Sequence, residues 1–286
     1  MHKFRMILPL LLLGSLLFSC DLINPPEKIP SYINIDTIRI QVDDFDQGSA
    51  THQISNVFLT VENSLLGIFE MPFTIPCLST GMQDVFIRPG IRLNGIAGSR
   101  IEYPFFTPFR DSVDLVAGEV TVISPVLTYK DECKFPWIED FEDAGVSFIY
   151  SQFADTTIKN QTSIVSSGRY SGAIFLDSIN RYFEATGPKD FVLPGNAATV
   201  LFEFDYITNL EFELGVYVLE DGAAIWNSLL VVRQNSNWKR FYADLHTTVA
   251  YNPNAEAYRI GFRAEYDSTR TETQHIFLDN VKLIHF

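Results

Sequence analysis

Residues 257–266, "AYRIGFRAEY", decide the fold class. Tyr258, Ile260 and Phe262 alternate along this stretch with Arg259 and Arg263. Successive side chains of an extended backbone point to opposite faces, so a period of two is typical of a strand with one face buried. The stretch therefore predicts a β-strand that has three apolar side chains in a core and two arginines on the other face.

The same rhythm recurs in both directions from this stretch. In "TVLFEFDYIT" (199–208), Val200 and three aromatic residues alternate with Leu201, Glu203 and Asp205, and "HIFLDNVKLIHF" (275–286) closes the chain. Runs of β-branched and aromatic residues are broken by Gly, Asn, Asp and Pro, and helical periodicity is almost absent. The sequence predicts an all-β protein.

The strand candidates fall into two groups. Residues 32–130 hold short ones, which fit a small β-sandwich of immunoglobulin-like or transthyretin-like type. In the first of them, "INIDTIRIQV" (33–42), the alternation changes face near Thr37, which predicts a β-bulge. The charged segment "KDECKFPW" (130–137) marks a boundary, and the longer strands of residues 137–286 suit a jelly-roll β-sandwich.

The N-terminus has the pattern of an export signal. His2, Lys3 and Arg5 precede an apolar run (6–18) that is shorter than the ~20 residues a membrane-spanning helix needs. The run ends in "LFSC", which resembles a bacterial lipobox. The resemblance implies a signal peptide at 1–19, an acylated Cys20 and a proline-rich tether at 20–31; a cysteine within an ordinary signal is the alternative.

Four segments carry a second resemblance. "WIEDFED" (137–143), "SSGRYSGAIFLDS" (166–178), "VLFEFDYIT" (200–208) and "FLDNVKLIHF" (277–286) look like the galactose-binding-like jelly roll that many carbohydrate-binding modules use. The whole layout resembles exported lipoproteins of the Bacteroidota. This implies a lipid-anchored protein of the cell envelope, expected at the outer membrane, that binds a glycan or another envelope protein.

The jelly-roll resemblance also implies one structural calcium ion. Such an ion takes six to eight oxygen ligands, from carboxylates and backbone carbonyls. Glu142 and Asp279 would give side-chain oxygens, and carbonyls near Gly168 and Ser171 would complete the site. The alternative is a solvated acidic turn, together with an Asp-Asn pair that bonds its own backbone at a strand kink.

Exposed aromatic rings are the sugar platforms of such modules, because a ring face stacks on the C–H bonds of a sugar. Trp226, near a loop in "AAIWNS", and Tyr182, with Arg181 and Glu184 beside it, are the candidate ligand-binding residues. For Trp238 we expect packing in the core.

No catalytic motif is recognisable, so we expect a protein that is not an enzyme. None of the histidines of the mature chain stands at metal-binding spacing (His52, His246, His275 and His285). Glu203 and Asp205 could form a glycosidase pair, or they could be acids that face solvent. A structural subunit of a surface or transport complex, without a sugar ligand, and a glycan hydrolase or esterase stay as alternatives.

The net charge of the chain limits the kinds of molecule that it is expected to bind. Loss of residues 1–19 removes Lys3 and Arg5 and moves the formal charge from −14 to −16. Such an acidic body argues against nucleic acid as a partner.

Two kinds of covalent modification are suggested by short patterns. Cys77 and Cys133 could form a disulfide in an exported protein, or both could be free buried thiols. O-glycosylation in Bacteroidota uses Asp-Ser/Thr motifs, although such pairs also form turns. The candidate hydroxyls are those of Thr37, Ser112, Thr156, Ser178 and Ser268.

Overall fold

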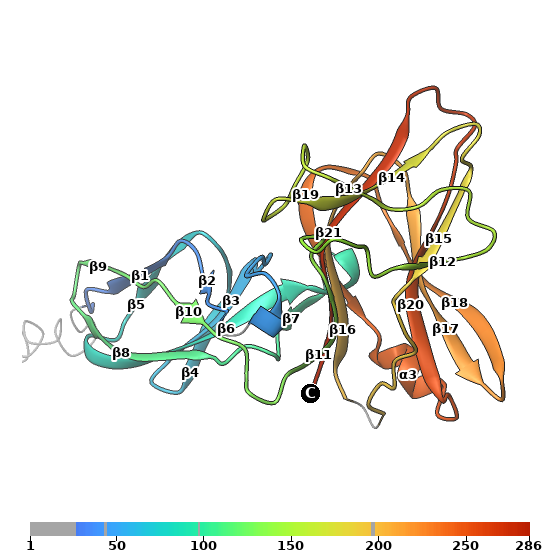
Figure 1. Cartoon of the computed structure of the whole chain (residues 1–286). Coiled ribbons are helices and arrows are strands. Elements are labelled where there is room, and N and C mark those ends of the chain that lie inside the picture. Colours follow the sequence, from blue (N-terminus) through green and yellow to red (C-terminus); the bar gives the residue numbers. More distant parts are fainter. Residues whose placement is uncertain (1–26, 43–44, 97, 196–197) are drawn as a thin grey trace, which may run out of the picture.

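The computed structural model describes residues 27–42, 45–96, 98–195 and 198–286. Figure 1 shows two β-rich bodies side by side, a smaller N-terminal one and a larger C-terminal one. The predicted all-β fold of two sandwiches is confirmed. Within the described ranges, no helix is both long and apolar enough to cross a membrane.

The smaller body is a sandwich of one five-stranded sheet and two short ones. The larger sheet has the order β4-β3-β6-β7, with β8 also paired to β6; the others are β5-β1-β9 and β10-β2. The elements are β1 (Ser31–Ile35), β2 (Arg39–Ile40), η1 (Phe45–Gln47), β3 (Asn56–Val61), β4 (Ser64–Glu70), β5 (Phe73–Cys77), β6 (Gly81–Arg92), η2 (Leu93–Gly95), β7 (Arg100–Glu102), β8 (Phe109–Leu115), β9 (Val120–Val122) and β10 (Val126–Leu127).

The change of face near Thr37 has a different cause from the predicted bulge. The chain leaves the sheet after Ile35, and Arg39 starts β2 in a separate two-stranded sheet. Ile35 and Ile38 are both buried. The apolar pattern therefore changes face because the strand ends and a second one begins, not because one residue is inserted.

The larger body consists of two sheets packed face to face. We call the sheet β13-β14-β21-β16-β19, with β11 paired to β21, the inner sheet, and β12-β15-β20-β17-β18 the outer sheet. The inner sheet lies nearer the small sandwich in Figure 1. Its elements and those of the outer sheet are β11 (Lys134–Glu139), β12 (Ile149–Tyr150), β13 (Lys159–Gln161), β14 (Ser171–Leu176), β15 (Tyr182–Thr186), β16 (Val200–Thr208), β17 (Phe212–Glu220), β18 (Ala223–Val232), β19 (Asn235–Asp244), α3 (His246–Tyr251), β20 (Ala257–Glu265) and β21 (Gln274–His285).

The core between these sheets follows the predicted alternation. Phe202 and Phe204 of β16 pack on Phe262 of β20, with ring centroids 5.7 and 5.0 Å away from it. All three side chains are fully buried. Truncation of such an aromatic side chain to alanine costs about 3–5 kcal/mol, so these strands are fixed in register by their rings.

A bulge in β21 changes which residues face the core. Leu278 and Val281 both face the core, and the register against β16 shifts between Glu203 and Asp205. Asn280 takes a left-handed φ of 50°, and its N–H donates to Oδ1 of Asp279 over 2.8 Å. This is the strand kink that was the alternative explanation of the Asp-Asn pair.

The outer face of the inner sheet is covered by the small sandwich. Leu201, Tyr242 and Ile284 belong to the same apolar cluster as the core of the small sandwich. The ring of Tyr242 lies 5.9 Å from that of Tyr103, and its hydroxyl accepts a hydrogen bond from the N–H of Gln53. The two sandwiches therefore share a packed junction, which fixes one relative to the other.

Candidate functional site

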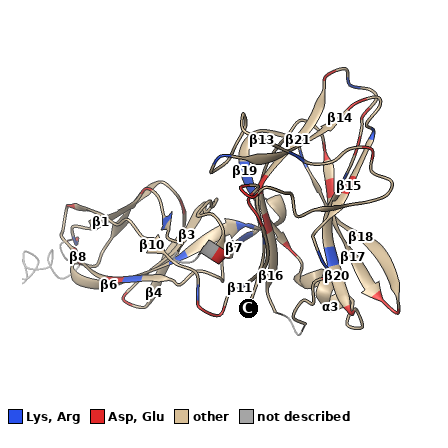
Figure 2. Cartoon of the chain, viewed as in Figure 1, with Lys and Arg blue, Asp and Glu red and all other residues tan. Residues whose placement is uncertain are grey.

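The face of the outer sheet that points away from the core carries a cluster of aromatic and charged side chains. Alternation puts four of them there, because the odd residues of β17 and β20 and the even residues of β15 are outside the core, and the fifth lies on β18 opposite Tyr217 of β17. The cluster, which we call the open face, consists of Tyr182, Glu184, Tyr217, Trp226 and Arg263. Acidic and basic residues both colour this sheet in Figure 2.

Glu184 is the centre of the open face. Its carboxylate accepts hydrogen bonds from the hydroxyls of Tyr182 and Tyr217, each over 2.5 Å, and from Nη2 of Arg263 over 3.1 Å. Burial alone would raise the pKa of Glu184, but these hydrogen bonds outweigh it and hold the pKa below its usual value. Glu184 therefore stays charged and fixes both phenol rings by their hydroxyls.

Arg263 links this carboxylate to Trp226. Its guanidinium carbon lies 3.9 Å from the centroid of the Trp226 ring, and its Nη2 donates to the Tyr217 hydroxyl over 2.7 Å. Trp226 in turn lies against Gly215, where a Cβ would clash with its ring, and its Nε1–H donates to Glu213 over 3.3 Å. Nε of Arg263 is buried and has no hydrogen-bond partner among the described residues.

A hollow of 290 Å³ opens beside Tyr182 and Arg263. Glu213 of β17, Val231 of β18 and Glu265 of β20 also line it. Its walls are partly polar and partly apolar, and most of the polar side chains are held in place by the contacts above. Ligand pockets of proteins have this composition, with a few fixed polar groups among apolar walls.

The sequence-predicted ligand residues are only partly brought together. Tyr182 and Trp226 both lie on the open face, and Glu184 lies between the tyrosines. Trp226 differs from the expected free platform, because the guanidinium of Arg263 lies over its ring. Arg181 is exposed, precedes β15 and donates its backbone N–H to Asp155.

Sequence reasoning missed Tyr217, Glu213 and the role of Arg263. Alternation placed Arg263 away from the core, and the same signal is present in "FELGVYVLE" (212–220), where Glu213 and Tyr217 alternate with core residues. The strand order β15-β20-β17-β18 brings these side chains together. That order joins strands far apart in the chain, so no local pattern reveals it.

Glu203 and Asp205 do not face solvent and do not form an open acid pair. They are 1% and 3% exposed, and Arg240 bonds both, over 2.8 Å to Glu203 and 2.9 Å to Asp205. Glu203 also accepts a hydrogen bond from the hydroxyl of Tyr103 in the small sandwich over 2.7 Å. The junction buries both carboxylates and Arg240 pairs with each, so they are not the solvent-facing acids of the alternative interpretation.

The residues of the predicted calcium site meet around one loop. Oε1 of Glu142 accepts the backbone N–H groups of Arg169 (2.6 Å) and Tyr170 (2.9 Å). Oδ2 of Asp279 accepts those of Ser166 (2.9 Å) and Ser167 (3.2 Å). Both carboxylates thus hold loop 166–170.

The fit to a calcium ion is poor in this conformation. The loop points N–H groups at Glu142, whereas a cation needs oxygens. The hydroxyl of Ser171 donates to the carbonyl of Ile164, and Gly168 packs against Glu142. The described part of the chain holds no group of three or more His, Cys, Asp or Glu placed for a metal. Calcium stays a prediction; a melting temperature unchanged by a chelator, together with no effect of Asp279→Ala on metal content, would remove it.

Cys77 and Cys133 are free thiols. Cys77 ends β5 and lies opposite Ser31 in the register of β1 and β5. The thiol of Cys133 donates to the carbonyl of Phe105 over 3.4 Å, and this residue precedes β11. The structure therefore agrees with the alternative of two free thiols and contradicts the suggested disulfide. Burial raises the pKa of Cys133 to about 11.

The other predicted modification sites are surface features or lie outside the described residues. Thr37, Ser112, Ser178 and Ser268 are exposed, and Thr156 is half-buried. Asp177 and Asp267 accept backbone N–H groups two residues ahead, as turn-forming aspartates do. O-glycosylation at these hydroxyls stays a prediction. Cys20 and the leader before it lie outside the described residues.

The chain was compared with protein-family models, curated proteins and solved structures, and only solved structures gave matches. No protein-family model matches it, and a search of curated proteins finds no match. Among solved structures, the xylan-binding domain from CBM 22 is 14% identical, with a TM-score of 0.38 over 54% of this chain and 96% of that one. The family 30 carbohydrate-binding module of a Clostridium thermocellum cellulosomal cellulase is 12% identical, with a TM-score of 0.39 over 51% and 96%.

A third similar structure is an enzyme domain. The enzymatically active domain of tailspike protein 4 of bacteriophage CBA120 is 13% identical, with a TM-score of 0.40 over 51% of this chain and 20% of that one. At these identities and TM-scores, none of the three assigns a function to this chain.

Proposed function

We propose that this protein binds glycans on the open face of its outer sheet and is not an enzyme. The observation that carries the proposal is the cluster of Tyr182, Tyr217 and Arg263 around Glu184, beside a hollow of 290 Å³. Most of its polar atoms are hydrogen-bonded to one another before any ligand arrives. A site arranged in advance loses little side-chain entropy when a ligand binds.

The groups on the open face suit the chemistry of a sugar. A pyranose has C–H bonds on its faces and hydroxyls at its edge, so it needs rings to stack on and charged or polar groups to bond. Half-buried Tyr182 offers a ring at the edge of the hollow, while Arg263 and Glu213 offer a donor and an acceptor. We assign the stacking to Tyr182, and to Trp226 the support of Arg263.

Binding to an array of plant, fungal and bacterial oligosaccharides, with xylohexaose and cellohexaose included, tests the proposal. Tyr182→Ala should weaken binding to any glycan that wild-type protein retains by about tenfold or more, since stacking of one ring is worth about 0.5–1.5 kcal/mol beyond its buried area. Trp226→Ala should also weaken it, because Arg263 loses its support.

The matched control is Tyr251→Ala. Tyr251 is 81% exposed at the end of α3 and makes no contact with the open face. Its removal should leave glycan binding unchanged. Binding that survives loss of Tyr182, or an array without any retained glycan, would contradict the proposal and favour the structural-subunit alternative.

We also propose that acylated Cys20 anchors the protein to a membrane of the cell envelope, expected to be the outer membrane. The lipobox-like end of the leader supports it. Several acyl chains at ~0.8 kcal/mol per buried CH₂ would hold the protein stably. Labelled palmitate should enter wild-type protein and not Cys20→Ala; equal labelling of the two would contradict the anchor. Protease shaving of intact cells would then show which way the two sandwiches face.

A further inference from the structure

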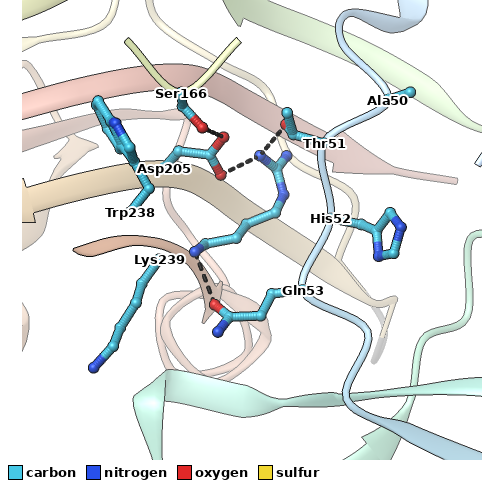
Figure 3. Close-up of a pocket in the computed structure, with 9 residues that line it drawn as sticks. Ala50, Thr51, His52, Gln53, Ser166, Asp205, Trp238 and Lys239 are labelled. Carbon is cyan, nitrogen blue, oxygen red and sulfur yellow. Dashed lines mark hydrogen bonds and ion pairs between the residues drawn. The ribbon is translucent and has the colours of Figure 1, made fainter. Parts of the chain in front are cut away.

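The junction of the two sandwiches holds a second cavity, of 440 Å³. The small sandwich contributes Thr51 and Gln53 from one loop, and the large sandwich contributes Ser166, Asp205 and Trp238. Figure 3 shows Trp238 and Ser166 beside Asp205, with the loop of residues 50–53 on the other side. Neither sandwich alone could form this cavity, and it lies on the opposite sheet from the open face.

Trp238 is placed as a platform and not as a core residue, which corrects the expectation from the sequence. It lies on β19 in alternation with core residue Phe241, on the face that carries Arg240 and Tyr242. The residue is half-buried. Within the described part of the chain, no other aromatic ring stacks on it, and its Nε1–H has no hydrogen-bond partner. A tryptophan left partly in solvent at a cavity wall can stack on an apolar ligand face.

The polar walls of the cavity are rigid. Asp205 is held by Nη1 of Arg240 (2.9 Å), the hydroxyl of Ser166 (2.9 Å) and the amide of Asn280 (2.8 Å). Gln53 accepts the backbone N–H of Arg240 through Oε1 over 2.9 Å. Its Nε2 has no partner among the described residues, and Ser166 keeps free lone pairs.

These free groups define the ligand chemistry. The indole N–H of Trp238 and the amide of Gln53 donate, and the Ser166 hydroxyl accepts. Arg240 in the cavity wall is opposed by two buried carboxylates, Glu203 and Asp205. The side chain of Lys239, which also lines the cavity, points away from Asp205 in Figure 3, so the wall is not a simple anion site. A cyclic polyol with an apolar ring face fits this set better than an ion does.

We propose that the junction cavity is a second saccharide site, separate from the open face, in which one sugar ring stacks on Trp238. Its hydroxyls face Gln53, Thr51 and Ser166. Because both sandwiches contribute, a sugar bound here contacts both of them.

The chain has three tryptophans, and the indole N–H signal of each one reports on a different part of the molecule. Trp137 is buried in the core with its Nε1–H bonded to Ser147, Trp226 is on the open face, and Trp238 is in the junction cavity. In ¹⁵N-labelled protein each gives one indole N–H signal, assigned with single Trp→Phe variants. The probes are glucose, galactose, mannose and N-acetylglucosamine at rising millimolar concentration, with sorbitol as an open-chain control that has hydroxyls but no ring.

At least one of the four sugars should shift the Trp238 signal saturably, while sorbitol and the Trp137 signal show no such change. Gln53→Ala should weaken that response at least threefold, and Tyr182→Ala should leave it intact. No shift at Trp238 with any of the four sugars, or an equal shift with sorbitol, would overturn the proposal. A shift at Trp226 alone would overturn this second site and leave the open face standing, whereas a shift at Trp238 alone would support the second site, and the open face would still be judged by the oligosaccharide array.

Discussion

Replacement of Arg240 by methionine is the sharpest test of the junction. Its side chain is 2% exposed and bonds Glu203 over 2.8 Å and Asp205 over 2.9 Å. Methionine has a similar length but no charge, so the variant leaves two buried carboxylates without the guanidinium that bonds them both. Removal of one partner from a buried ion pair costs about 3–5 kcal/mol, mostly because the remaining charge stays desolvated.

The expected loss is large enough to measure in two ways. Urea unfolding of a soluble form that starts after Cys20 should show the free energy of unfolding lowered by about 3–5 kcal/mol. The melting temperature should fall by roughly 6–20 °C, at about 2–4 °C for each kcal/mol in a chain of this size. Adding Glu203→Gln and Asp205→Asn to Arg240→Met should restore part of the loss, because neutral amides are cheaper to bury than unpaired charges.

Arg259→Met is the matched control. Arg259 also pairs with a carboxylate, Asp190, but both side chains are 42% exposed. Exposed pairs of this kind contribute about 0–1 kcal/mol. If Arg240→Met and Arg259→Met lose equal stability, the junction network is not buried as described and the reasoning is refuted.

Three further predictions concern Asp279, the two cysteines and Gly215. Burial, with the charge of Asp205 nearby, raises the pKa of Asp279 to about 7, so the folded chain binds more protons than the unfolded one between about pH 4 and 7. The stability that Asp279 contributes should fall as pH rises through that window, and Asp279→Asn should remove this fall in urea titrations; an identical pH profile would contradict it. Denatured, unreduced protein that lacks Cys20 should titrate as two thiols, from Cys77 and Cys133, and a count near zero would restore the disulfide. Gly215→Ala would drive a Cβ into the ring of Trp226, so it should weaken glycan retention on the array, and unchanged retention would exclude that ring from the site.

Alternation along the chain was enough to predict both faces of β16 and β20. Phe202, Phe204 and Phe262 are in the core as expected. The pattern could not tell what covers the second face, because a polar side chain on an outer face meets either water or another domain. Glu203 and Asp205 therefore looked like solvent-facing acids, although the small sandwich buries them.

The tryptophans show the same limit at the candidate sites. Trp226 and Tyr182 were predicted as ligand residues from exposed-looking positions near loops, and both lie on the open face. The pairing of Trp226 with Arg263 depends on the strand order β20-β17-β18, which local sequence does not encode. Trp238 was expected in the core, because it starts an alternating strand and the jelly rolls that the sequence resembles have a packed tryptophan at a similar place.

The most direct measurement is a crystal structure of the soluble chain with the best-retained oligosaccharide from the array. We expect electron density for sugar rings over the outer sheet, with one ring against Tyr182 and hydroxyls within hydrogen-bond distance of Arg263 and Glu213. Sugar seen elsewhere on the chain, with the open face bare at saturating ligand, would contradict this expectation.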